Sequence, residues 1–203
     1  MNRNQLQAAA THLAKKDKVL RNLLKKITLN EVEPNNDLFT ELALTIVSQQ
    51  LATNVARSIG NRVLTFFDGK PEAEKVVELP EGKLKEIGVS LAKEKAIRNL
   101  AEKVVSNTIV LKSFHELPEN QIRSILVDVK GIGNWTVDMF LMFSLAKPDV
   151  LAVGDLGVKK GIMKSYSLSL LPSDKQVLEM AEQYQWSPYK SVVCRLMWKS
   201  LEL

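Results

Sequence analysis

The sequence of 203 residues predicts an all-α protein of roughly ten helices. Apolar residues recur at helical spacing along most of the chain. The connections are short and are marked by proline, asparagine and glycine, as expected between packed helices. Only residues 108–111 form a short apolar run with the character of a strand. We therefore expect helices from one end of the chain to the other.

The first helix is expected over residues 5–27, where Leu6, Leu13, Leu20 and Leu24 lie on one side. Lysines occupy the other sides, as in a helix with a solvated face. Later helices are placed by an apolar stripe and by a polar or proline residue at the start. These expected helices cover 38–49, 53–63, two short segments bounded by Lys70-Pro71 and Leu79-Pro80, 88–105, 120–129 and 134–143, with others beginning near 155, 173 and 188.

A glycine hairpin interrupts the helical pattern at Lys130-Gly131-Ile132-Gly133. Glycine has no Cβ, so Gly131 and Gly133 can adopt positive φ and allow another backbone to come close. Asn134 is expected to cap the helix that follows, which leaves the first N–H groups of that helix pointing outward. Such amides at the positive end of a helix predict an anion site.

The composition indicates a basic globular protein. The apolar fraction of 45% can fill a sizeable core, and the net charge of +5 favours polyanionic partners without requiring one. The single cysteine, Cys194, excludes an internal disulfide and a four-cysteine metal or iron–sulfur site. The N-terminal residues lack the apolar core of a signal peptide, and the apolar run 137–146 is too short for a membrane span. We expect no membrane association and an intracellular location.

Two features have more than one interpretation when they are considered alone. Asp155 can simply cap the helix that begins after it, since aspartate is a preferred N-cap residue. The pair Gln49-Gln50 lies at a helix junction, where side-chain amides can cap exposed backbone groups.

Several motifs together resemble one family. The segments V-K-G-I-G-N-W-T-V-D and V-G-D-L-G-V-K-K-G are similar to those of the helix-hairpin-helix base-excision DNA glycosylases. The closer resemblance is to the 3-methyladenine DNA glycosylase II branch. The further matches are I-V-S-Q-Q-L-A at 46–52, G-V-S-L-A-K-E-K-A at 88–96 and W-S-P-Y-K-S-V-V-C-R-L-M-W at 186–198.

The resemblance implies a two-lobed helix-hairpin-helix fold in its compact form, without the N-terminal β domain of some bacterial members. One lobe of six helices would cover residues 36–146 and contain the helix-hairpin-helix at 120–146. The other would be built from both chain ends, residues 1–35 and 147–203. The active site is expected in the cleft between the lobes.

The resemblance also assigns a catalytic residue, because the family's catalytic aspartate corresponds to Asp155. A fixed carboxylate stabilises the positive charge that develops on the sugar when an N-glycosidic bond breaks. Members that also cut the DNA backbone have a lysine where this chain has Trp135, so a monofunctional enzyme without lyase activity is expected.

Further site residues follow from the same correspondence. The base pocket is expected to contain Trp135, Trp198, Met139 and Phe143. Many bacterial relatives have a tyrosine where Met139 stands. Gln50 corresponds to the wedge residue that fills the gap left by an extruded base, with Leu51 as its neighbour. A polar minor-groove contact of some relatives is replaced here by Ala52.

The hairpin is expected to hold DNA and an ion. The residues assigned to a backbone phosphate are Lys130, Gly131, Ile132, Gly133 and Thr136. In the family, main-chain oxygens here bind a monovalent cation, which assigns a structural Na⁺ or K⁺ to Val127, Val129 and Ile132. No other cofactor is expected.

The leading hypothesis is excision of alkylated purines, 3-methyladenine and 7-methylguanine, from double-stranded DNA in base-excision repair. The partner would be DNA with alkylated bases, and the protein would act as a monomer in the cytoplasm or nucleoid of a bacterium or in a eukaryotic nucleus. Two alternatives stay open: a non-catalytic helix-hairpin-helix protein that binds or senses damaged DNA, and a glycosylase for deaminated or mismatched bases.

Overall fold

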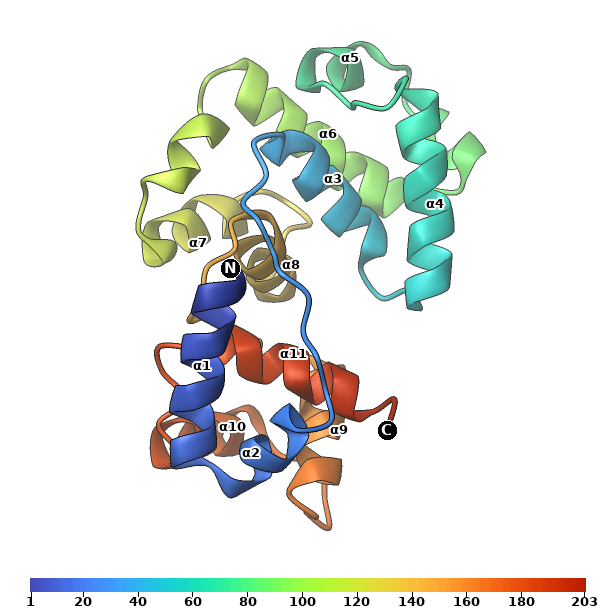
Figure 1. Cartoon of the computed structure of the whole chain (residues 1–203). Helices are drawn as coiled ribbons and strands as arrows, with labels where there is room; N and C mark the ends of the chain where they lie inside the picture. Colours follow the sequence, from blue (N-terminus) through green and yellow to red (C-terminus); the bar gives the residue numbers. More distant parts are fainter. The chain divides into compact units, whose positions relative to one another are not determined.

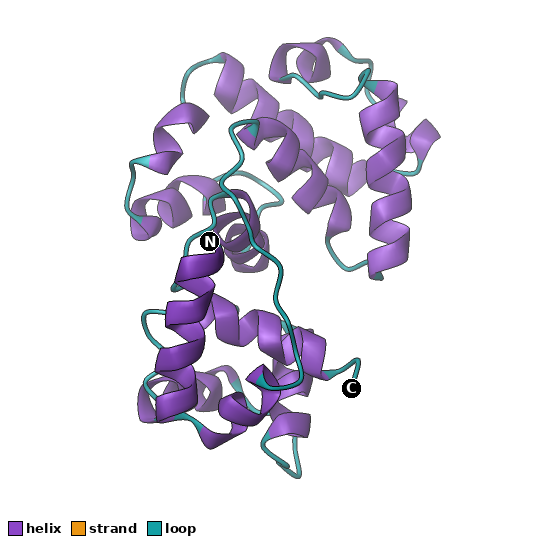
Figure 2. Ribbon diagram, in the orientation of Figure 1, coloured by secondary structure: helices purple, strands orange, loops and turns teal.

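The computed structural model describes all 203 residues and consists of helices and loops (Figure 2). It contains eleven α-helices, two short 3-10 helices (Lys83–Ile87 and Leu111–His115) and one π-helical turn (Phe140–Ser144). The all-α prediction is confirmed. The strand character of residues 108–111 was misleading, because these residues form a bend that leads into a 3-10 helix. None of the helices combines the length and the apolarity that crossing a bilayer requires.

The chain divides into two compact units. Unit 1 comprises residues 1–34 and 141–203, and unit 2 comprises residues 35–140. The lobes expected from the sequence placed the second boundary at 146, whereas here it falls inside the π-helical turn. Unit 2 is thus one continuous segment, and unit 1 is assembled from both ends of the chain.

Unit 1 packs five α-helices around an apolar core. Its helices α9 and α11 are in contact, as are α11 with α2 and α1 with α2. The fully buried side chains that form the core include Leu13, Leu20, Val158, Ile162 and Trp186. The helices are α1 (Arg3–Lys16), α2 (Lys18–Leu24), α9 (Leu156–Ser165), α10 (Asp174–Gln183) and α11 (Lys190–Ser200), labelled in Figure 1.

The single helix predicted for residues 5–27 is wrong, since Asp17 divides it into α1 and α2. Asp17 has an extended backbone, with φ −133° and ψ 114°, which a continuous helix does not allow. Its Oδ1 accepts hydrogen bonds from the amides of Val19 (2.8 Å) and Leu20 (3.2 Å). A side chain that can satisfy the first amides of a new helix competes with helix continuation, so the apolar period alone was an incomplete guide.

Asp17 also joins the two ends of the chain within unit 1. Its carboxylate is 1% exposed, and its Oδ2 accepts from the Tyr166 hydroxyl and from the Trp186 indole Nε1 (3.1 Å). Burial, together with the hydrogen bond to Asp17, raises the pKa of Tyr166, which therefore stays protonated and able to donate. The buried charge is stabilised by four donors, two from its own helix start and two from the C-terminal part of the chain.

Unit 2 is organised around α3, which contacts α4, α6 and α8. Its fully buried residues include Leu42, Ile46, Leu100, Ile122 and Leu126. The predicted junction near residue 50 is present as a break between two helices. The helices of unit 2 are α3 (Leu38–Ser48), α4 (Thr53–Phe66), α5 (Ala73–Glu78), α6 (Leu91–Val105), α7 (Glu119–Val127) and α8 (Asn134–Met139), all shown in Figure 1.

We predict that Asp17→Ala lowers the stability of unit 1 by about 3 kcal/mol, because four donors lose their acceptor in a buried site. Tyr166→Phe removes only one of them and should cost about 1 kcal/mol. Thermal unfolding followed by tryptophan fluorescence measures both. The role given to Asp17 is contradicted if its alanine variant melts as high as Tyr166→Phe.

Candidate nucleic-acid interface and active site

The hairpin between α7 and α8 depends on Gly131. This residue has φ +90°, in the left-handed region that favours glycine, and a Cβ built on it would lie 2.4 Å from the Cβ of Ala96. The hairpin therefore rests directly on α6. The side chain of Asn99 on the same helix holds the turn as well, because its Oδ1 accepts from the Lys130 amide (3.0 Å).

Two details of the predicted hairpin need correction. Gly133 has φ −106° and ψ 177°, so only one of the two glycines uses the left-handed region. Gly133, and not Asn134, is the N-cap residue of α8, and it has no side chain with which to satisfy the first amides of the helix. Gly131, Gly133 and Asn134 are exposed. An N-cap without a side chain leaves these amides accessible, which is what an anion site at a helix start requires.

A partly buried ion pair holds the two helices of the hairpin together. Arg123 on α7 donates through Nη2 to Oδ1 of Asp138 on α8 at 2.6 Å, and Asp138 is 5% exposed. A signal for this pair was present in the sequence, because Asp138 interrupts an otherwise apolar run. A planar guanidinium is well suited to fix a carboxylate in one geometry.

Thr136 does not fit the direct phosphate contact expected for it. It is 1% exposed, and its hydroxyl accepts a hydrogen bond from the amide Nε2 of Gln49 at 2.8 Å. The same nitrogen donates to the main-chain oxygen of Gly131 at 3.0 Å. Lys130 is exposed as expected, whereas the side chain of Ile132 is buried and only its backbone is relevant to an anion.

The residues assigned to a cation fit such an ion in chemical terms. Val127 is the last residue of α7, and carbonyls at a helix C-terminus lack intrahelical partners and carry partial negative charge. Val129 O accepts from the Ile132 amide at 3.0 Å, and an oxygen has a second lone pair available. The chain places no cluster of three or more acidic, histidine or cysteine side chains that could hold a metal ion.

Gln50, the residue expected to act as the wedge, lies at the tip of a tight turn between α3 and α4. Gln49 has φ −51° and ψ 131°, Gln50 has φ +55°, and the Leu51 amide donates to Ser48 O at 3.2 Å. These values describe a type II turn, whose third position normally holds glycine or asparagine. Gln50 is exposed and Leu51 is half-buried. Ala52 is the N-cap of α4 and makes no side-chain cap.

Trp135 and Met139 lie one helical turn apart on α8, and both are partly exposed. The α-helix expected over 134–143 ends at Met139, and the π-helical turn that follows carries Phe143. A π turn has i→i+5 hydrogen bonds instead of i→i+4.

In unit 1, Asp155 is both the N-cap of α9 and the acceptor for a tryptophan. Its Oδ1 accepts from the Val158 amide and from the Trp198 indole Nε1, each at 2.7 Å. Asp155 itself is neither buried nor fully exposed. The capping role considered from the sequence is thus real. It also fixes the carboxylate, because two donors hold one of its oxygens.

Trp198 is fixed on two sides. Its N–H donates to Asp155, and its ring stacks on Phe143, with ring centroids 5.9 Å apart and planes 28° apart. Phe143 remains 40% exposed, which is high for a large aromatic side chain. A carboxylate and a partly exposed aromatic pair therefore form one connected group in unit 1.

Two glycines of α9 allow the Trp198 ring to lie against Asp155, and their role was not predicted from the sequence. A Cβ on Gly157 would lie 2.8 Å from Cδ1 of Trp198, and one on Gly161 would lie 2.3 Å from Met197 O. Helix α11 therefore approaches α9 along a face without side chains. Two glycines four residues apart were the available signal, since that spacing places them on one helix face.

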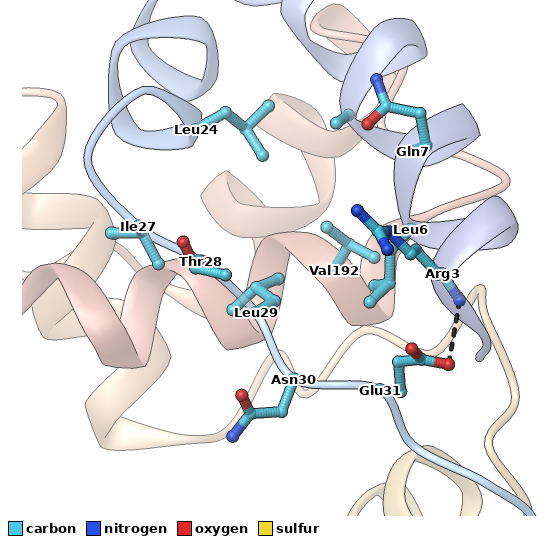
Figure 3. A pocket seen from close by; sticks show the side chains of 11 residues that line it. Arg3, Leu6, Gln7, Leu24, Ile27, Thr28, Leu29, Asn30, Glu31 and Val192 are labelled. Atoms are coloured by element: carbon cyan, nitrogen blue, oxygen red, sulfur yellow. Dashed lines mark hydrogen bonds between the residues drawn. The ribbon is translucent and has the colours of Figure 1, made fainter.

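The larger cavity of unit 1 is separate from these residues. It measures about 700 Å³ and lies between α1, α2 and residues 27–31, where the Arg3 amide donates to Glu31 at 3.0 Å (Figure 3). No predicted site residue lines it. A second cavity of about 280 Å³ is bordered by Phe143 and Trp198 but also by Arg195 and Lys199.

Fold and site together define an all-helical protein with an exposed glycine hairpin at a helix start in one unit and a fixed carboxylate in the other. The family model for HhH-GPD superfamily base excision DNA repair proteins matches residues 43–185. The chain therefore belongs to this superfamily, and the resemblance seen in the sequence is confirmed.

Similar proteins include two yeast enzymes. The chain is 31% identical to the DNA-3-methyladenine glycosylase of Saccharomyces cerevisiae, over 94% of this chain and 78% of that protein. It is 28% identical to DNA-3-methyladenine glycosylase 1 of Schizosaccharomyces pombe, over 98% of this chain and 89% of that protein. The structure of the Schizosaccharomyces pombe 3-methyladenine DNA glycosylase Mag1 in complex with abasic DNA superposes with a TM-score of 0.87 and 27% identity, covering 97% of each chain.

We predict that Gly157→Ala destabilises unit 1 by about 1–3 kcal/mol, because the new methyl group collides with the Trp198 ring. Gly154→Ala is a matched control, since a Cβ there has nothing within 4 Å. Urea unfolding followed by tryptophan fluorescence measures both variants. Equal stability of the two variants would show that Trp198 can move aside freely.

Proposed function

We propose that the protein is a monofunctional DNA N-glycosylase that extrudes alkylated purines, such as 3-methyladenine and 7-methylguanine, from double-stranded DNA and removes them by hydrolysis. The observation that carries this proposal is the Asp155 carboxylate, which is held by two N–H donors beside a stacked aromatic pair. The names of the similar yeast enzymes support the substrate class. We propose that the protein acts as a monomer inside the cell.

Asp155 supplies the negative charge that the reaction needs. When the N-glycosidic bond breaks, positive charge develops at C1′ of the sugar, and a fixed carboxylate stabilises it without reorganising. Val158 and Trp198 bind the same oxygen, Oδ1, and so set the direction in which the carboxylate faces. The carboxylate also orients the water that attacks the sugar.

The substrate class follows from the chemistry of the leaving group. A purine alkylated at N3 or N7 carries a positive charge and departs as a neutral base, so it needs no proton from the protein. Neither His12 nor His115 belongs to the residues assigned to the site. Electron-rich rings attract such a cation, at about 0.5–2 kcal/mol per contact. Trp135 and Trp198 are the rings proposed for this task, with Met139 and Phe143 beside them.

The absence of lyase activity is proposed from Trp135. Cleavage of the backbone by β-elimination requires an amine that forms a Schiff base with the sugar, and an indole cannot do so. The product should therefore be DNA with an intact abasic site.

The hairpin and the turn in unit 2 are proposed to bind the DNA. The exposed amides at Gly131 and Gly133 would hold a backbone phosphate without regard to sequence, and Lys130 would add its charge. Gln50, exposed at the turn tip, would fill the space left by the extruded base. Main-chain oxygens of Val127, Val129 and Ile132 would hold Na⁺ or K⁺, which would supply positive charge near the phosphate.

We predict that the purified protein releases methylated purines from methylated duplex DNA and that Asp155→Asn slows this release at least about 100-fold. Asparagine keeps an oxygen that can accept from Val158 and Trp198, so the change removes charge and leaves the geometry. Chromatography identifies the released bases, and gel analysis with and without alkali distinguishes abasic sites from cut strands.

The control for this test is Glu179→Gln, which removes an exposed carboxylate of α10 in the same unit and should leave the rate unchanged. Base release by Asp155→Asn at the parental rate would refute the role of the carboxylate. DNA binding without release of any base would favour the alternative of a non-catalytic DNA-binding protein. Release of only deaminated or mismatched bases would favour the alternative of a glycosylase for those bases.

We predict opposite effects of Gln50→Gly on stability and on activity. Glycine adopts the left-handed conformation without strain and should stabilise unit 2 by about 0.5–1 kcal/mol, but it lacks the wedge side chain. Gln50→Ala removes the wedge and keeps the strain, so it should lose activity without gaining stability. Denaturant unfolding and single-turnover base release measure the two effects. Full activity of both variants would exclude Gln50 as the wedge.

A further inference from the structure

The side chain of Gln49 connects the two DNA-binding parts of unit 2. It belongs to the turn that presents Gln50, and its Nε2 donates to Gly131 O (3.0 Å) and to Thr136 Oγ1 (2.8 Å). A primary amide nitrogen carries two hydrogens, so both are used. Gly131 lies at the tip of the hairpin, and Thr136 lies in the first turn of α8.

The position of Thr136 makes this connection stiff. The residue is 1% exposed, so its hydroxyl is largely shielded from water, and its hydrogen bond to Gln49 is part-buried. The hairpin itself cannot shift easily, because Gly131 lies directly against Ala96 on α6. Gln49 is thus bound to a part of unit 2 that is fixed from another side.

The other end of the turn is held by Lys93. Its Nζ donates to Val47 O at 2.8 Å, at the C-terminal end of α3, where a cation is favourable. Burial lowers the pKa of Lys93, so this ammonium is partly removed from water. The turn is therefore held between α6 and the hairpin by two hydrogen-bonding side chains.

The conformation of the turn needs such support. Gln50 adopts φ +55°, which glycine and asparagine tolerate better than other residues. A strained conformation persists only when the surrounding structure determines it, and such strain is found at functional sites. Gln49 is the residue before Gln50, and its hydrogen bonds hold the turn in this conformation.

We propose that Gln49 is a positioning residue, which sets the distance and direction of Gln50 relative to the hairpin amides that hold the phosphate. Its role is to keep Gln50 ready for insertion while the neighbouring phosphate is held. This inference rests on the proposed function. The inference adds to the proposed function a residue that determines how efficiently a paired base is extruded.

The matched variants are Gln49→Glu and, in the other unit, Gln183→Glu on the exposed end of α10. Glutamate has the same shape as glutamine, but as a carboxylate it donates no hydrogen bond and would face the Gly131 carbonyl oxygen. Gln49→Leu removes both donors without adding charge. It replaces Gln49→Glu if circular dichroism shows that the glutamate variant does not fold.

The experiment compares two duplexes of one sequence that carry 7-methylguanine, either paired with cytosine or mispaired. A mispaired base costs less to extrude, so the need for a well-placed wedge falls. We expect Gln49→Glu to slow single-turnover release from the paired duplex about tenfold or more and from the mispaired duplex less than about threefold. Gln183→Glu should leave both rates unchanged. The salt dependence of binding to abasic DNA should be unchanged in Gln49→Leu, which adds no charge, because the hairpin amides remain.

A double-mutant cycle with Thr136→Val tests the hydrogen bond between Gln49 and Thr136. If Gln49 acts through Thr136 and the hairpin, Gln49→Leu should slow release from the paired duplex less in the Thr136→Val background than in the parent. An equal loss on both duplexes, or no loss on either, would overturn the positioning role while the parental enzyme stays active. A parental chain that releases no base from either duplex would instead overturn the proposed function, and the role of Gln49 with it.

Discussion

Both groups of site residues depend on one constraint. Each contains a contact so close that the residue there must be glycine, because a Cβ would collide with its neighbour. Gly131 lets the hairpin rest on Ala96, and Gly157 lets the Trp198 ring lie against the Asp155 carboxylate. Gly161 lets α11 pack on α9 along its backbone. Interiors are packed at high density, so a single extra methyl group at such a contact must displace its neighbours. The glycines therefore determine where the polar groups of the site can lie.

The chemistry is divided between the units. Unit 2 contains backbone amides, a strained turn and a bridging glutamine, which suit binding and deformation of a nucleic acid. Unit 1 contains a carboxylate whose direction is fixed by an indole and by a helix amide. Members of one superfamily can thus vary the groups that bind DNA and the groups that react with the base on separate parts of the fold.

The sequence allowed the helical class, the hairpin and Asp155 to be predicted, because each has a local signal: an apolar period, a glycine pair and an N-cap residue. It could not show that Asp17 divides the first helix, since the donors Tyr166 and Trp186 come from the far end of the chain. The partners of Gln49 are equally distant in sequence. The π turn that carries Phe143 could not be predicted for another reason, because a π turn leaves no mark in the pattern of apolar residues.

The discontinuous construction of unit 1 has a consequence for folding during synthesis. Residues 35–140 are complete once the ribosome has passed them, so unit 2 can fold while the chain is still growing. The first 34 residues must wait, because Asp17 finds Tyr166 and Trp186 only after nearly the whole chain has been made. The Asp155–Trp198 contact also belongs to this late-forming unit, so the Asp155 carboxylate becomes fixed only near the end of translation.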